Sequence, residues 1–166
     1  MSGAVVWLTG LPSAGKSTLA VRLVARLRAL HRPCALLDGD EVRRALVPSP
    51  DYSEAGRDSL YATLGRLAAM LAKQDDLVAV VAATAHRQAW RAQARAIAPR
   101  FIEVHLAVAL AECRARDAKG LYASGAKGLP GLDLPYEAPR AAEVVALGGQ
   151  DSRALDAIVH LLEASP

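Results

Sequence analysis

Aromatic residues and long apolar runs are both scarce in this chain of 166 residues. Phenylalanine, tyrosine and tryptophan make up 4% of the sequence although 52% of it is hydrophobic, so the core must consist mainly of aliphatic side chains and alanine. No apolar run is long enough to cross a bilayer. Met1 is followed by a short apolar stretch without the regions of a signal peptide. We therefore expect a cytoplasmic protein of one domain with no membrane partner.

Cysteine is also scarce, and basic residues are not clustered. Cys34 and Cys113 lie in or beside apolar segments without metal-ligand spacing, so we expect small core residues rather than a disulfide. The net charge is +3 and the pI about 9.1. However, no basic cluster is interleaved with aromatic residues, as would be expected for a nucleic-acid-binding surface. The mild positive excess favours small anionic ligands over a nucleic acid.

The clearest motif that the chain does contain is a phosphate-binding loop. Residues 10–18 read GLPSAGKST and fit the pattern G-x-x-x-x-G-K-[ST]. An apolar run at 4–9 precedes it, as expected for a buried parallel strand, and leucines at helical spacing follow it. A turn that binds nothing is the alternative, which the complete motif between strand and helix disfavours. The predicted ATP-binding residues of the loop are Gly10, Leu11, Pro12, Ser13, Ala14, Gly15, Lys16, Ser17 and Thr18.

The chemistry of such a loop assigns roles to its last residues. Glycines let backbone N–H groups approach a phosphate, and the following helix N-terminus adds partial positive charge. Lys16 would neutralise the β- and γ-phosphates, and the Ser17 hydroxyl would bind Mg²⁺. The sequence therefore predicts binding of a nucleoside triphosphate with Mg²⁺ as cofactor.

Two carboxylates follow the next apolar run, at residues 34–37. Asp38 and Asp40 would lie at the carboxyl end of a parallel strand, where open α/β sheets bind their ligands. Near a triphosphate, one carboxylate can hold Mg²⁺ while the other accepts a proton from an attacking hydroxyl. The alternative is a turn in which one aspartate caps the following helix. We favour the first interpretation, in which one of the two aspartates joins Ser17 at the metal and the other acts as the base.

The rest of the chain alternates apolar runs with amphipathic segments. Residues 117–139 are rich in glycine, proline and lysine without periodicity and predict a long, mobile loop. The alternation predicts an α/β fold, namely a single three-layer P-loop NTPase domain over residues 1–166 with a mainly parallel sheet. We expect further strands at 77–83, 102–108 and 143–147 and helices at about 57–73, 88–97, 110–116 and 152–162.

Four blocks in this order resemble the adenylylsulfate (APS) kinases. They are the phosphate loop, residues 37–43 (LDGDEVR), residues 116–122 (RDAKGLY) and residues 131–139 (GLDLPYEAP). The resemblance covers nearly the whole chain, and the last two blocks are the specific ones. It implies an ATP-dependent kinase that transfers the γ-phosphoryl group to the 3′-hydroxyl of adenosine 5′-phosphosulfate. It also implies a homodimer.

The resemblance further implies roles for individual residues. Lys16, Asp38 and Asp40 would be catalytic, with Asp38 a metal ligand beside Ser17 and Asp40 the base at the acceptor hydroxyl. Arg116 and Lys119 would belong to a lid over the ATP phosphates, within a lid and acceptor loop at about 117–139. Tyr136 and Glu137 would shape the acceptor pocket. The residues implied to bind the anionic acceptor are Asp40, Arg43, Arg57, Thr84, Arg87, Lys127 and Leu129.

Departures from the family pattern lie on the acceptor side. Leu60 and Ala62 stand where the family usually has Asn and Arg, residues 84–87 (TAHR) replace Ser-Pro-Tyr-Arg, and residues 129–130 (LP) replace Phe-Thr. Two alternatives therefore stay open: a related kinase acting on another nucleotide-linked or anionic hydroxyl acceptor, and a catalytically weak nucleotide-binding regulatory protein. For His86 a surface position is the simpler interpretation, and contact with an anionic substrate the alternative.

Overall fold

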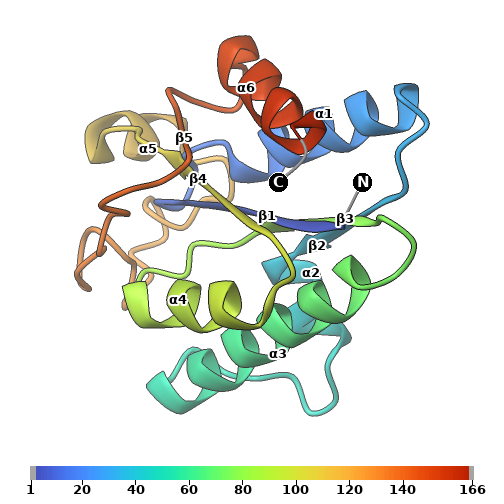
Figure 1. The fold of residues 1–166 in the computed structure, drawn as a ribbon. Coiled ribbons are helices and arrows are strands. Elements are labelled where there is room, and N and C mark those ends of the chain that lie inside the picture. Colours follow the sequence, from blue (N-terminus) through green and yellow to red (C-terminus); the bar gives the residue numbers. More distant parts are fainter. Residues whose placement is uncertain (1–2, 165–166) are drawn as a thin grey trace.

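The computed structural model describes residues 3–164, which form one parallel sheet with helices on both faces (Figure 1). The strand order is β2-β3-β1-β4-β5. The predicted three-layer α/β fold is confirmed. The strands are β1 (Ala4–Gly10), β2 (Cys34–Asp38), β3 (Val78–Ala82), β4 (Phe101–Leu106) and β5 (Val144–Ala146). The helices are α1 (Lys16–Ala29), α2 (Gly39–Ala45), α3 (Glu54–Ala72), α4 (Gln88–Ile97), α5 (Leu110–Arg116) and α6 (Ser152–Glu163).

Strand β1 is the centre of the sheet, and its sequence explains why. All of its residues are buried, because β3 and β4 pair with its two edges and helices cover both of its faces. A strand in this position must be apolar on both sides, which accounts for the uninterrupted run at 4–8. Strand β5 lies at the edge of the sheet, and its middle residue Val145 is exposed.

The sheet separates two hydrophobic cores. On one face, Leu23 of α1 and Ile158 of α6 pack against strand residues such as Val6. On the other face, α3 and α4 cover a core that holds Trp7, Tyr61, Trp90 and Phe101. There Trp90 stacks on Tyr61 at a centroid distance of 4.5 Å. Figure 1 shows α1 and α6 on one side of the strands and α2, α3 and α4 on the other.

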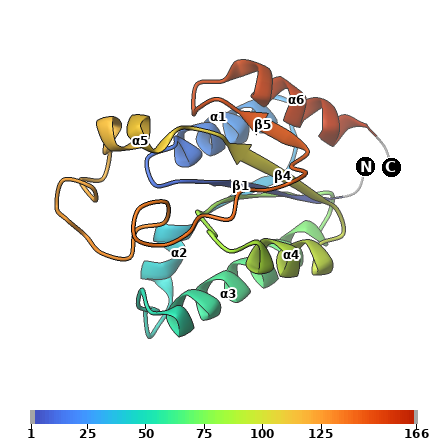
Figure 2. The same cartoon turned by 90° about the vertical axis from the view of Figure 1, so that its left-hand side faces the viewer.

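The strand order brings three loops to one edge of the sheet. Strands β2 and β3 lie on one side of β1, and β4 and β5 lie on the other, so the chain changes side after β3. Ligands of open α/β sheets bind at the carboxyl ends of strands near such a switch point. The phosphate loop after β1, the aspartates after β2 and residues 83–87 after β3 all lie at this edge. In Figure 2, the loop between α5 and β5 crosses the same edge from α5 towards α2.

Two predicted element boundaries differ from the structure by more than one residue. Helix α3 begins at Glu54 rather than near Arg57, because the Ser53 hydroxyl accepts a hydrogen bond from Gly56 N at 3.1 Å and caps the helix. Strand β4 ends at Leu106 rather than at Val108, because the Val108 N–H turns back to the Leu106 carbonyl. Both errors lie at element ends, where local hydrogen bonds rather than periodicity set the boundary.

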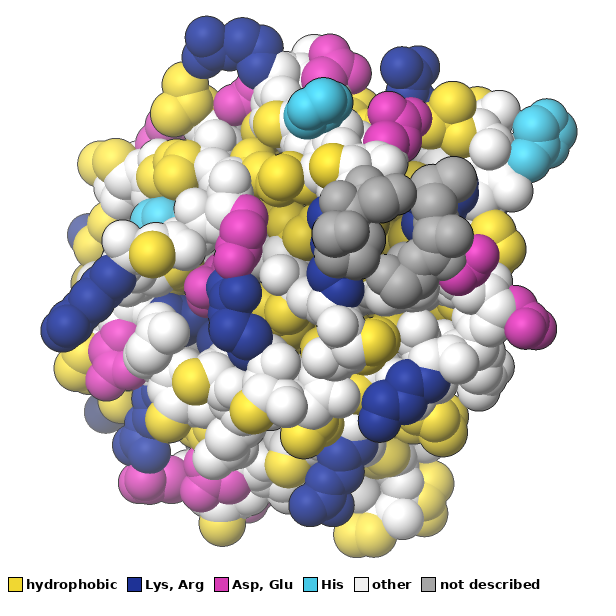
Figure 3. Space-filling model, in the orientation of Figure 1, with side chains coloured by type: hydrophobic (Ala, Val, Ile, Leu, Met, Phe, Trp, Pro, Cys, Tyr) yellow, Lys and Arg dark blue, Asp and Glu magenta, His cyan; other side chains and the backbone are white. Residues whose placement is uncertain are grey.

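The remaining expectations from composition concern thiols, charge and membranes. Cys113 is buried, Cys34 is half-buried, and both are free thiols, as expected. On the face shown in Figure 3, lysine and arginine side chains are scattered among acidic and apolar ones. Within residues 3–164, the helices are all too short or too polar to span a bilayer.

Candidate active site

The phosphate loop has the backbone shape that its glycines predict. Gly15 has a φ of 99°, and a Cβ atom at this position would lie 2.5 Å from Gly149 N, so only glycine fits. Gly15 is the N-cap of α1, and among the described residues no side chain caps this helix end. Its first-turn N–H groups are therefore available to an anion, and the helix dipole favours negative charge at this point.

Lys16 lies inside the loop. Its ammonium group donates hydrogen bonds to the carbonyls of Gly10 at 3.0 Å and Leu11 at 2.8 Å. Burial, reinforced by the charge of Lys119, lowers the pKa of Lys16 to about 8. A lysine in this environment is stabilised by an added anion, because the anion supplies the negative charge that the loop carbonyls supply only partially.

Ser17 and Asp38 meet across the gap between the phosphate loop and the end of β2. The Ser17 hydroxyl donates to Asp38 Oδ2 at 2.7 Å. The other oxygen, Asp38 Oδ1, accepts from Asp40 N at 3.0 Å and caps α2. The capping alternative therefore applies to Asp38 Oδ1, while Oδ2 faces the phosphate loop.

Asp40 forms an ion pair with Lys119 of the loop that follows α5. Burial alone would raise the pKa of Asp40, but Lys119, Lys16 and Arg43 together hold it below its usual value. Asp40 is therefore ionised at neutral pH and can accept a proton. The contact also brings the predicted base and the predicted lid lysine together, although they are far apart in the sequence.

Residues 117–139 contain no helix or extended strand, as predicted, but their first part is tied to the phosphate loop. Ala118 N donates to Ser13 Oγ at 3.2 Å, and the Tyr122 hydroxyl donates to the Pro12 carbonyl at 3.0 Å. Arg116 pairs with Glu112, one helical turn earlier, and its guanidinium lies beside Gly148. The predicted lid residues therefore flank the phosphate loop.

Arg43 is buried and held by the protein itself. Its Nη1 donates to the carbonyls of Pro50 at 2.7 Å and Asp51 at 2.6 Å, and its guanidinium lies 4.1 Å from the centre of the Tyr52 ring. Only 7% of the residue is exposed. The structure thus gives Arg43 the task of ordering the segment between α2 and α3, beside Asp40, whose pKa it lowers.

The other predicted acceptor residues lie around the same edge of the sheet. Arg57 Nη2 donates to the Gly128 carbonyl at 2.8 Å, which places α3 against the acceptor loop. Arg87 pairs with Glu54 at 2.6 Å. Thr84 is half-buried at the end of β3, and its carbonyl accepts from Thr9 Oγ1 at 2.6 Å. Two residues remain: Lys127 is exposed and Leu129 is buried.

His86 is not a surface residue, so the simpler interpretation of this histidine is wrong. Only 5% of it is exposed, and its ring meets Trp90 edge-on at 4.9 Å. Burial, reinforced by the positive charges of Arg57 and Arg87, lowers the pKa of His86 to about 4. The ring is therefore neutral at physiological pH in the structure as it stands.

Sequence reasoning missed a buried ion pair between Arg91 of α4 and Glu103 of β4. The two side chains are 1% and 5% exposed, and Arg91 Nε donates to Glu103 Oε1 at 2.7 Å. A signal was present, because a glutamate within the apolar run of a buried strand requires a partner. Arg91 also contacts the backbone at Ala85 and Glu137.

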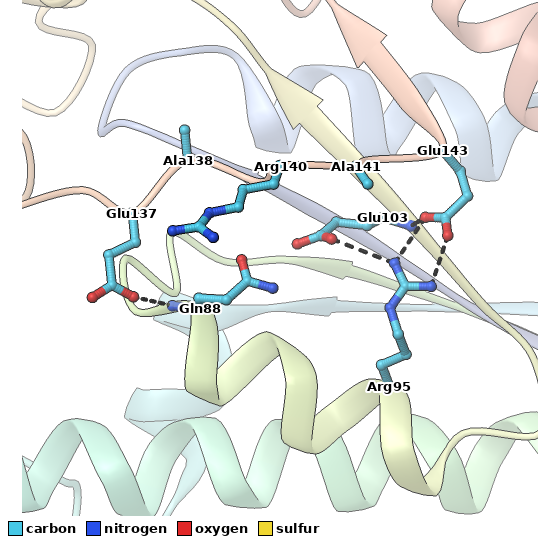
Figure 4. A pocket seen from close by; sticks show the side chains of 8 residues that line it. All are labelled: Gln88, Arg95, Glu103, Glu137, Ala138, Arg140, Ala141 and Glu143. Atoms are coloured by element: carbon cyan, nitrogen blue, oxygen red, sulfur yellow. Dashed lines mark hydrogen bonds and ion pairs between the residues drawn. The ribbon is translucent and has the colours of Figure 1, made fainter.

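A cavity of about 950 Å³ opens between α4 and the segment before β5. Figure 4 shows Arg140 reaching into it, with Glu137 at one end and the Arg95–Glu143 pair at the other. Its lining includes Glu137, which was predicted to shape the acceptor pocket, but within residues 3–164 it includes none of the predicted catalytic or ATP-binding residues and none of the residues predicted to bind the acceptor directly. Motif geometry rather than cavity size therefore locates the candidate active site at the carboxyl edge of the sheet.

Comparison with known sequences points to a single family. Residues 2–147 match the family model described as adenylylsulphate kinase. An adenylyl-sulfate kinase of Synechococcus sp. (strain JA-3-3Ab) is 40% identical over 90% of this chain and 87% of its own length. A probable bifunctional SAT/APS kinase 2 of Sorangium cellulosum is 42% identical over 92% of this chain, which spans 27% of that longer protein.

Solved structures give the same result. The Mycobacterium tuberculosis APS kinase CysC, solved in complex with AMPPNP and APS, has a TM-score of 0.87 and 30% identity and covers 98% of this chain and 99% of its own. A hexameric APS kinase from Thiobacillus denitrificans has a TM-score of 0.69 and 31% identity over 98% of this chain and 29% of its own. This chain belongs to the adenylylsulfate kinase family.

Proposed function

We propose that this protein is an ATP-dependent kinase that phosphorylates the 3′-hydroxyl of adenosine 5′-phosphosulfate. The carrying observation is the convergence of Lys16, Asp38, Asp40 and Lys119 at the carboxyl edge of the sheet, in a chain of this family. In the reaction, the 3′-oxygen forms a bond to the γ-phosphorus and the bond to the β,γ-bridging oxygen breaks. The hydroxyl proton goes to a base, and ADP leaves.

The ATP phosphates would lie on the N–H groups of the phosphate loop. Lys16, already inside the loop, would contact the β- and γ-phosphates and offset the charge that shifts during transfer. Arg116 and Lys119 would approach from the lid and exclude water that would otherwise hydrolyse ATP. Gly10, Leu11, Pro12, Ser13, Ala14, Gly15, Ser17 and Thr18 complete the proposed ATP site.

Ser17 and Asp38 fit a magnesium ion bound together with ATP. Their hydroxyl and carboxylate oxygens are hard ligands that lie within 2.7 Å of one another. Within residues 3–164, no three His, Cys, Asp or Glu side chains are placed to hold a metal by themselves. That suits Mg²⁺, which takes one or two protein ligands and completes its shell with phosphates and water. When bound, the ion would offset phosphate charge.

Asp40 is the proposed base, because it is ionised and lies beside Lys16 and Lys119. The acceptor would lie between Asp40 and the loop at 117–139. Arg57 would pair with its phosphosulfate, and Arg43 would act mainly by shaping the segment next to it. Leu129 would pack on the adenine, with Thr84, Arg87 and Lys127 at the rim of the acceptor site.

Neither alternative is favoured by the comparisons. A coupled assay of ADP release, run with and without adenosine 5′-phosphosulfate, tests the proposal. We expect release to be strongly stimulated by low concentrations of this acceptor. Turnover with only another acceptor, or tight ATP binding without acceptor-dependent turnover, would contradict it.

Association into a homodimer and a cytoplasmic location remain predictions. The first derives from the family resemblance and the second from the composition, and one solved relative is described as hexameric. Sedimentation of the purified chain at several concentrations measures its oligomeric state and tests the predicted homodimer. A monomer at all concentrations would contradict it.

A further inference from the structure

Arg91 is the most connected buried side chain near the acceptor side, and the chemistry proposed above does not use it. Its Nε donates to Glu103 Oε1 at 2.7 Å, and its Nη1 donates to the Ala85 carbonyl at 2.5 Å. Its Nη2 donates to Gln88 Oε1 at 2.7 Å and to the Glu137 carbonyl at 2.5 Å. One guanidinium thus joins α4, β4, the end of β3 and the end of the acceptor loop.

The two backbone segments that Arg91 joins also contact each other directly. Glu137 N donates to the His86 carbonyl at 2.8 Å, and Gln88 N donates to Glu137 Oε2 at 2.6 Å. Figure 4 shows Glu137 reaching the start of α4 at Gln88. These bonds hold residues 84–88 against residues 136–137.

A second tie lies at Tyr136. Its hydroxyl is 2.9 Å from Thr9 Oγ1, and Thr9 Oγ1 donates to the Thr84 carbonyl. Because the Thr9 hydroxyl has only one proton, Tyr136 must be the donor of the first bond. Burial raises the pKa of Tyr136 to about 12, so its hydroxyl keeps the proton it donates.

We propose that Arg91 is a positioning residue for the acceptor: its fork fixes residues 136–137 against residues 84–88, and this contact sets the shape of the acceptor side. Arg91 is 1% exposed and cannot touch a substrate itself. A guanidinium is required because its planar fork serves several acceptors at once, whereas a lysine ammonium acts as a point charge. Glu103 compensates the buried charge and orients the fork.

Arg95 provides a matched control on the same helix. It pairs with Glu143 at 2.7 Å and contacts Glu103 at 3.4 Å, so it shares the acidic partner of Arg91. Within residues 3–164 its side-chain hydrogen bonds go to Glu143 and Glu103, and not to the backbone of residues 84–88 or 136–137. Arg95→Met therefore removes a positive charge near Glu103 and leaves the Arg91 fork in place.

The test compares the steady-state kinetics of full-length Arg91→Met and Arg95→Met. The inference rests on the proposed function, which names adenosine 5′-phosphosulfate as the acceptor. We expect Arg91→Met to raise the KM for adenosine 5′-phosphosulfate about 10-fold or more, the effect of losing hydrogen bonds from a charged group. The KM for ATP should change by less than about twofold, and Arg95→Met should leave both near wild type, since surface pairs contribute little. Equal changes in both KM values, or equal effects of the two substitutions, would overturn it.

Arg91→Met leaves Glu103 without its main partner and could unfold the protein, so a second variant removes that charge too. In Arg91→Met/Glu103→Gln the buried carboxylate is gone, and the melting temperature should recover towards wild type. The raised KM for the acceptor should persist, because the fork is still missing. Recovery of the KM together with stability would overturn the positioning role.

Hydrogen exchange separates this inference from the proposed function. In the ligand-free protein, amides of residues 133–142 should exchange about 10-fold faster in Arg91→Met than in Arg95→Met, because their ties to residues 84–88 are lost. This readout needs no substrate, so it stands even if wild-type protein lacks activity with adenosine 5′-phosphosulfate. Unchanged exchange in Arg91→Met would contradict the inference.

Discussion

The proposed ATP side and the proposed acceptor side of the candidate site are built in different ways. On the ATP side, Lys16 and its two carbonyl partners lie within a few residues of one another, so a short motif specifies the geometry. On the acceptor side, Arg57 meets Gly128 and Arg91 meets Glu137, contacts that only the complete fold can create. A few glycines are enough to preserve the geometry of the phosphate loop, whereas the geometry of the acceptor side depends on contacts between many separate segments. The family departures at 84–86 and 129–130 lie on that second side.

Loss of Lys16 tests the ATP side and should have the largest effect. We expect Lys16→Ala to lower kcat by about 10²-fold or more, because it removes charge stabilisation from the phosphoryl group in transfer. Lys73→Ala, at an exposed position at the end of α3, is the matched control and should retain wild-type turnover. ADP release at saturating substrates measures both, and near-normal turnover of Lys16→Ala would show that its role is misassigned.

Asp40 lies where the two sides meet. We expect Asp40→Asn to lower kcat by about 10²-fold with little change in either KM, because an amide cannot accept the proton. Asp156→Asn on the exposed face of α6 controls for the loss of one charge. A rise in the KM for ATP with unchanged kcat would assign Asp40 to lid closure through Lys119 instead.

Loss of Arg57 tests the acceptor side. Arg57→Met should raise the KM for the acceptor about 10-fold, the range expected for one charged hydrogen bond, and leave the KM for ATP unchanged. Arg66→Met, exposed on the same helix, should change neither constant. A comparable loss of ATP affinity in Arg57→Met would mean that the two sides are not separable.

His86 should have the smallest effect, on stability rather than on turnover. Its pKa in the folded protein is about 4 against an ordinary 6.5, so between these values the unfolded chain binds a proton that the folded chain does not. The free energy of unfolding should therefore fall as the pH drops from 6.5 to 4, by up to about 1.4 kcal/mol per unit. His86→Phe keeps a ring against Trp90 and should flatten this decline. Urea titrations between pH 6.5 and 4 measure the free energy of unfolding. Parallel declines in the wild type and in His86→Phe would rule out His86 as the source of the pH dependence.

The sequence predicted the parts of the molecule in which short-range patterns determine structure. The apolar run of β1, the glycines at 10 and 15 and the leucines of α1 predicted the sheet centre and the phosphate loop. The aspartates after β2 were expected to face that loop, and the Ser17–Asp38 contact places Asp38 there.

The rest depended on contacts between distant segments. No local pattern indicates that Arg91 reaches the Glu137 carbonyl, or that His86 is covered by Trp90. Arg43 had the right residue type for an anion site, but its Nη1 donates to the two carbonyls of the α2–α3 segment. A single capping hydrogen bond at Ser53 makes α3 begin earlier than its hydrophobic periodicity predicts. For Arg91, Arg43 and Ser53, hydrogen bonding in the folded chain decided the outcome, and for His86 a ring contact did. Neither is visible in the hydrophobic periodicity of the sequence.

The most direct test of the central claim follows the γ-phosphoryl group itself. The protein is incubated with γ-labelled ATP, Mg²⁺ and adenosine 5′-phosphosulfate, and the labelled products are separated and identified. We predict that the label appears as a 3′-phosphate ester on adenosine 5′-phosphosulfate in step with ADP formation. Label that stays in ATP or appears only as inorganic phosphate would contradict transfer between two ligands at the Lys16 and Asp40 edge of the sheet.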